Sequence, residues 1–190
     1  MRPENRLAGS AGDTPAVNPD DADVTFAGRR SQETLVAIHD HLRDELAKLQ
    51  DLVDQLQAGV VSPVAARSHV ATMTMRQNYW TLGAFCAAYC RLLTLHHTIE
   101  DQRLFADLRS EDPALGPVLD RLSAEHEVIA AVLDDVDRAL VALIGAADDR
   151  GRELEAVEKA VERLETSLLE HLDGEESALL GPIGRLSVAI

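Results

Sequence analysis

Two segments of the chain repeat one pattern, a histidine followed by a carboxylate four residues later. They run from His96 to Glu100 and from His171 to Glu175, and Glu176 follows the second. Positions i and i+4 of an α-helix lie on one face, so each segment can direct an imidazole and a carboxylate to the same point. This mixture of nitrogen and oxygen ligands suits iron or manganese. The repetition therefore predicts a metal site built by several helices.

Further histidines extend the candidate ligand set. His126 falls within the apolar stripe of another segment, and either His39 or His41 can contribute from the first. His39 is favoured because Leu35 and Leu42 share its helix face, whereas acidic residues occupy the corresponding positions around His41. Burying these groups without a metal would cost much desolvation energy. We therefore predict a pair of metal ions inside a four-helix bundle, the alternative being a metal-free bundle with incidental histidines.

Composition points to a helical protein and excludes several partners. Of the 190 residues, 46% are hydrophobic but only 3% are aromatic, which is typical of an all-α protein. The formal net charge of −15 leaves no basic stripe for nucleic acid. No apolar run is long enough to span a membrane, and the N-terminus lacks a secretory signal pattern. We expect a cytoplasmic protein.

The apolar periodicity predicts one helical domain. Residues 1–30 lack a sustained period and are expected to form a flexible tail. Residues 31–190 form the domain, with a short extra helix from about 62 to 75 between its first two long helices. Gly181 and Pro182 are expected to end or kink the last long helix. The short connections imply an antiparallel up-down-up-down four-helix bundle, with long helices over about 31–57, 80–108, 118–143 and 154–179.

On these motifs the chain resembles the hemerythrin-like proteins of the HHE cation-binding family. The resemblance implies a four-helix bundle around a non-haem di-iron centre, bridged by two carboxylates and an oxo or hydroxo oxygen, where O2 binds at an open iron position. It matches His96, Glu100, His126 and His171 to metal ligands. The motifs that carry it, one on each long helix, are His39-Asp-His41-Leu-Arg43, HHTIEDQRLF at 96–105, Glu125-His126-Glu127 and HLDGEESALL at 171–180.

The resemblance leaves some ligands open. Glu175 lies on the apolar stripe, but oxygen-carrying members of the family place this carboxylate five residues after the histidine, which favours Glu176. His97 lies one residue off the inward line, so we expect it to support a ligand or lie at the surface. The oxygen carriers also have a second histidine four residues after the third-helix ligand. In this chain that position is Ala130.

The alanine at this position shapes the expected function. One iron would have fewer protein ligands, and water, His97, Glu127 or a substrate would take the position. We therefore predict oxygen activation rather than reversible carriage, in an O2-dependent oxidoreductase acting on a small molecule or on peroxide. The alternative is a sensor of O2, redox state or iron, a carrier, or a store. The pocket is expected to be framed by Tyr89, Leu93, Leu122, Ile129 and Ala130.

Overall fold

All regular structure is helical in residues 23–58, 85–146 and 150–190, the ranges that the computed structural model describes. This confirms the predicted all-α class. The tail up to residue 22 and the short helix expected over 62–75 lie outside these ranges. None of the helices within them has an apolar stretch long enough to cross a membrane. The elements are α1 (Phe26–Gln57), α3 (Phe85–Ile99), η2 (Glu100–Leu104), α4 (Phe105–Glu111), η3 (Pro113–Leu115), α5 (Gly116–Gly145) and α6 (Arg150–Leu186).

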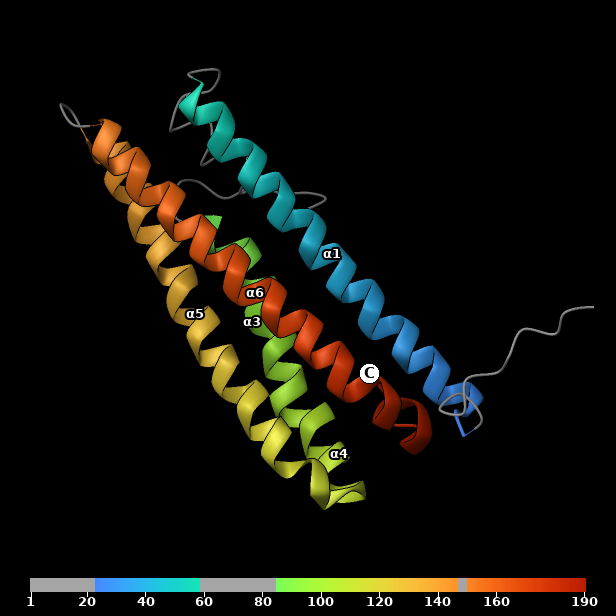
Figure 1. Cartoon of the computed structure of the whole chain (residues 1–190). Helices are drawn as coiled ribbons and strands as arrows, with labels where there is room; N and C mark the ends of the chain where they lie inside the picture. The colour runs from blue at the N-terminus through green and yellow to red at the C-terminus, as the bar shows by residue number, and fades with distance from the viewer. Residues whose placement is uncertain (1–22, 59–84, 147–149) are drawn as a thin grey trace, which may run out of the picture.

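The four long helices are α1, the continuous run of α3, η2 and α4, then α5 and α6. Successive helices run in opposite directions, and α6 lies alongside both α1 and α5 (Figure 1). The α3 segment packs on α5. The arrangement is the predicted four-helix bundle.

The interior consists of two apolar clusters with a polar layer between them. On α1 the first cluster begins at Leu42 and the second includes Leu35, so His39 falls between them. The same alternation recurs on every long helix. We call the intervening layer the polar belt, and its members are the buried residues His39, His96, His97, Glu100, His126, His171 and Glu175.

The start of α1 and the end of α6 meet in a contact that corrects two predicted boundaries. The first helix begins at Phe26 rather than at residue 31, where the Thr25 hydroxyl accepts a hydrogen bond from the Gly28 N–H at 2.9 Å. A Cβ at Gly28 would overlap the carbonyl of Gly184, so only glycine permits this approach. The last helix continues through Pro182 to Leu186. Burial of this turn against α1 offsets the hydrogen bond that proline removes.

Candidate metal centre

The polar belt draws side chains from all four long helices. α1 contributes His39, and the second long helix contributes three belt residues. His126 comes from α5, and α6 contributes His171 and Glu175. Every belt residue is at most 8% exposed. Except at His97, their burial follows from the sequence pattern, because each occupies a position in an apolar stripe that leucine or valine fills one turn away.

The belt divides into two groups of potential ligand atoms. The first group is His39, His96, Glu100 and Glu175, and the second is His97, Glu100, His126 and His171. Within each group the nitrogen and oxygen atoms lie within 4.8 Å of one another. Glu100 belongs to both groups.

Glu100 places one oxygen toward each group. Its Oε1 lies 3.1 Å from His96 Nε2 and 3.9 Å from His39 Nε2. Its Oε2 lies 3.6 Å from His126 Nε2. A carboxylate with its two oxygens directed at separate sets of imidazoles has the geometry of a bridging ligand.

Glu175 also lies near histidines of both groups. Its Oε2 is 3.5 Å from His39 Nε2 and 3.6 Å from His171 Nε2. Glu175 and its Oε atoms are fully buried and have no hydrogen-bond partner in the described part of the chain. The same is true of both Oε atoms of Glu100.

Several imidazole nitrogens in the belt also lack partners. The Nε2 atoms of His39, His96 and His97 are buried without a hydrogen bond among the described residues. Buried polar atoms normally find partners, because leaving one unpaired costs about 1–3 kcal/mol. So many orphaned atoms facing one another fit a pair of cations, and the nitrogen and oxygen donor set agrees with that.

Three of the five histidines are held through their other ring nitrogen. The Nδ1 of His39 lies 2.8 Å from Glu176 Oε1. Asp101 Oδ2 is 3.1 Å from His126 Nδ1, and Glu125 Oε2 is 3.0 Å from His171 Nδ1. A carboxylate only accepts hydrogen bonds, so each Nδ1 carries the hydrogen and each Nε2 is left with a lone pair directed into the belt.

A π-helical turn occupies the second long helix at the belt. In η2 the N–H of Phe105 donates to the carbonyl of Glu100, five residues earlier. A π-turn has more residues per turn than an α-helix, so successive side chains are closer in direction. Glu100 can therefore enter the belt while Asp101, the next residue, reaches His126. The repeating i,i+4 pattern in the sequence gives no sign of this turn.

Burial is the main cause of the pKa shifts in the centre. It lowers the pKa of His96 to about 3, with further lowering by neighbouring imidazoles, and it lowers the pKa of His171 to about 4. It raises the pKa of Glu175 to about 8, and that of Glu100 well above its usual range. At neutral pH the metal-free belt thus disfavours every charge, and a bound cation must displace protons from the carboxyl groups.

The structure separates the predicted ligands into two sets. Six of them meet in the belt. His41 is exposed, because it is two residues from His39 and therefore about 200° away around the helix. Glu176 touches His39 Nδ1 from outside the belt, so the carboxylate that lies with the potential ligand atoms is Glu175. The six are His39, His96, Glu100, His126, His171 and Glu175.

His97 occupies the place that the sequence pattern left open. It was expected to support a ligand or lie at the surface, but it is 6% exposed and belongs to the second ligand group. Its ring stacks on that of His126, with centroids 3.9 Å apart. Ala130 and Glu127 are both exposed. Of the four candidates for the position left by Ala130, which were water, His97, Glu127 and a substrate, His97 is the one whose side chain lies among the potential ligand atoms, and it comes from α3.

The residues that hold the histidines were not predicted in that role. Asp101 follows Glu100 directly, and Glu125 precedes His126 directly. An acidic residue beside a predicted ligand was the only signal in the sequence. Of the residues expected to frame a pocket, Leu93, Leu122 and Ile129 pack in the apolar clusters, and the side chain of Tyr89 is outside the described set.

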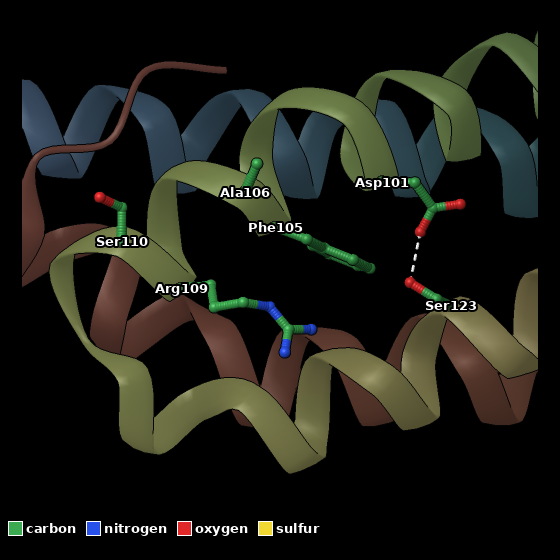
Figure 2. A pocket seen from close by; sticks show the side chains of 6 residues that line it. All are labelled: Asp101, Phe105, Ala106, Arg109, Ser110 and Ser123. Carbon is green, nitrogen blue, oxygen red and sulfur yellow. Dashed lines mark hydrogen bonds between the residues drawn. The ribbon is translucent and has the colours of Figure 1, made fainter.

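A depression of about 440 Å³ adjoins the centre on the side of His126. Figure 2 shows Phe105 between Arg109 and the hydrogen-bonded pair of Asp101 and Ser123. Phe105 stacks on His126 with centroids 5.6 Å apart, so one ring separates the depression from the belt. The depression is lined by Asp101, Phe105, Ala106, Arg109, Ser110 and Ser123.

Comparison with known proteins places the chain in a family. The family model described as Hemerythrin HHE cation binding domain matches residues 30–182, which is more than half of the chain and includes the whole belt. Neither a curated protein nor a solved structure shows significant similarity to the chain.

Proposed function

The chain belongs to the hemerythrin HHE cation-binding domain family, and on that premise we propose that it binds two iron ions, with manganese as the alternative metal. The observation that supports this is the sharing of Glu100 by the two ligand groups. His39, His96 and Glu175 would complete one position, and three imidazoles would complete the other. A single octahedral ion takes six ligands, which would leave buried carboxylate oxygens and imidazoles of the belt unpaired.

We further propose that the centre binds and activates O2, as an oxidoreductase that oxidises a small molecule or disposes of peroxide. A di-iron pair supplies reversible O2 binding and the electrons for O2 reduction. Each group offers four ligating residues, fewer than an octahedral ion takes, so exogenous ligands can enter the centre. The apolar clusters on both sides of the belt exclude bulk water from the centre. The depression over Phe105 provides a place for a small molecule one ring away.

A second function, O2 or redox sensing, carriage or storage, is favoured by His97. It raises the number of imidazoles in the belt to five, and imidazole-rich ligation restricts the open positions at which oxygen reacts further. The same ligand set thus serves both proposals, and they differ in whether bound O2 is released unchanged or reacts further.

Stopped-flow absorption of the anaerobically reduced, iron-loaded protein mixed with O2 tests the proposal. Two iron ions per chain and a band that decays faster when a reductant or peroxide is added are expected for the oxidoreductase. A stable oxygenated band, reversed by removing O2, would favour carriage or sensing. Iron content of one or less per chain after loading would exclude the dinuclear centre.

A further inference from the structure

Arg43 reaches from α1 to two carboxylates of α6. Its NH1 lies 2.8 Å from Glu176 Oε1, and its NH2 lies 2.8 Å from Asp173 Oδ1. NH1 is also 3.4 Å from Asp40 on its own helix. The Arg43 and Glu176 side chains are 25% and 21% exposed, so this pair is less screened by solvent than a pair between fully exposed side chains.

The oxygen that Arg43 contacts is the one that holds His39. Glu176 Oε1 accepts from Arg43 and lies 2.8 Å from His39 Nδ1. The guanidinium fixes the direction of this carboxylate, and the carboxylate in turn requires the hydrogen of His39 to be on Nδ1. His39 Nε2 then presents its lone pair to the belt.

This contact matters because α1 brings a single residue, His39, to the belt. The direction of the His39 ring therefore depends on how α1 is placed against α6. Arg43 lies one turn after His39 on the same helix and ties that turn to α6 through a planar fork of two hydrogen bonds.

We propose that Arg43 is a positioning residue for the metal position formed by His39, His96, Glu100 and Glu175. It acts through Glu176, which it holds against His39 Nδ1, so that His39 offers Nε2 to the metal. The inference rests on the proposed metal-binding function and adds to it the control of one position by an arginine outside the ligand set.

Two other arginines form ion pairs with a carboxylate oxygen that does not hold a histidine, and they serve as comparisons for Arg43. Arg121 contacts Glu125, but on the oxygen that His171 does not use and from the same helix as Glu125. Arg163 of α6 pairs with Asp135 of α5 at 3.2 Å, between exposed side chains remote from the belt. Arg163 is therefore the matched control, an interhelical ion pair with no histidine behind it.

The test is anaerobic titration of the full metal-free chain with Fe(II) or Co(II), comparing wild type, Arg43→Gln, Arg43→Lys and Arg163→Gln. Arg43→Gln is expected to weaken one of the two binding steps by about tenfold or more and to leave the other nearly unchanged. Arg43→Lys keeps the charge but not the fork, so partial recovery is expected. Arg163→Gln should match wild type at both steps.

A second measurement is independent of metal. Long-range ¹H–¹⁵N NMR of the metal-free protein reports which nitrogen of His39 carries the hydrogen. Wild type and Arg163→Gln should show the hydrogen on Nδ1, whereas Arg43→Gln should show a mixture. If Arg43→Gln does not yield folded protein, Arg43→Lys supplies the same comparison, with an intermediate tautomer ratio expected.

The outcomes separate this inference from the proposed function. If wild type binds two ions and Arg43→Gln resembles Arg163→Gln in both affinities and tautomer, the positioning role is wrong and the metal centre stands. If wild type binds fewer than two ions, the dinuclear function fails, and the tautomer comparison alone decides whether Arg43 orients His39.

Discussion

His126 and His171 face each other through their Nε2 atoms at 3.1 Å. Each ring donates its Nδ1 hydrogen to a carboxylate, so in their neutral forms both Nε2 atoms carry lone pairs. Burial lowers the pKa of both histidines, which opposes a proton between them. Two lone pairs at this distance repel each other, and a cation bound by both removes the repulsion. This pair therefore supports the second metal position directly.

His97→Ala should reduce the metal content from about two ions per chain to about one. The variant removes one imidazole from the group that contains His126 and His171 while leaving the other group intact. Metal analysis after anaerobic loading measures the change. Glu127→Gln is the control, since Glu127 is exposed on the neighbouring face of α5. Full metal content in His97→Ala would place His97 among the supporting residues, as the sequence pattern indicated.

Ala130→His should add no ligand. Ala130 is exposed, so a histidine there would point to solvent rather than into the belt. We expect unchanged metal content and an unchanged spectrum after reaction with O2, and no recovery of metal in the double variant with His97→Ala. A gain of a histidine ligand by spectroscopy would mean that α5 is rotated relative to the structure described here.

Asp101→Asn should weaken metal binding at the position of His126 by about 10- to 100-fold. Asparagine can present its amide NH2 to His126 Nδ1, and that arrangement would move the ring hydrogen to Nε2, where it blocks the metal. Metal titration measures the affinity. Ser123→Ala should have a smaller effect, because Ser123 donates to Asp101 Oδ1, at 2.5 Å, and not to the Oδ2 that faces His126. Equal effects of the two substitutions would contradict the tautomer argument.

Stability of the metal-free protein should fall as the pH rises from about 7 to 8, above the range in which the five belt histidines titrate in the unfolded chain. The pKa of Glu175 is raised from an ordinary value near 4.5 to about 8, so in this window the folded state retains a proton that the unfolded state has released. One such proton gives a slope of up to about 1.4 kcal/mol per pH unit. Below pH 6.5 stability should also fall as the pH is lowered, because the histidines with lowered pKa values become protonated in the unfolded state but not in the folded state.

The stabilisation by metal should show the reverse trend. Binding displaces protons from the carboxyl groups, so the metal-induced increase in Tm should grow between pH 6.5 and 8. Thermal melts with and without Fe(II) measure both trends. In Glu175→Gln the metal-free slope should shrink, and the metal-free protein should melt at a higher temperature at pH 8 than wild type. Parallel pH profiles in the two proteins would assign the slope to groups other than Glu175.

Much of the architecture could be predicted because apolar residues recur at helical spacing along every long helix. Leucine and valine recur at the same spacing as His39, His126 and His171, so the stripe that defines each helix also identifies its inward histidine. The ends of α1 and α6 could not be found in this way. They depend on the close approach of Gly28 and Gly184, which are distant in sequence.

The details of the centre depend on contacts that a single helix does not encode. His97 lies off the regular inward line, and its burial reflects its stacking on His126 of another helix. The choice between Glu175 and Glu176 was open in the sequence because both lie near the inward face. The structure separates them by assigning Glu176 to His39 Nδ1 and to Arg43.

The polar belt also bears on how the chain unfolds. It separates the two apolar clusters of the interior. Without a metal, burial of the belt contributes little free energy of folding, because many of its polar atoms have no hydrogen bond. Cooperativity between the two ends of the bundle then depends on the helix backbones and on the few hydrogen bonds that join helices at the belt. A bound metal pair would link all four helices at the midpoint and join the clusters into one unfolding unit. Hydrogen exchange would report this as two levels of amide protection in the metal-free chain and one in the loaded chain.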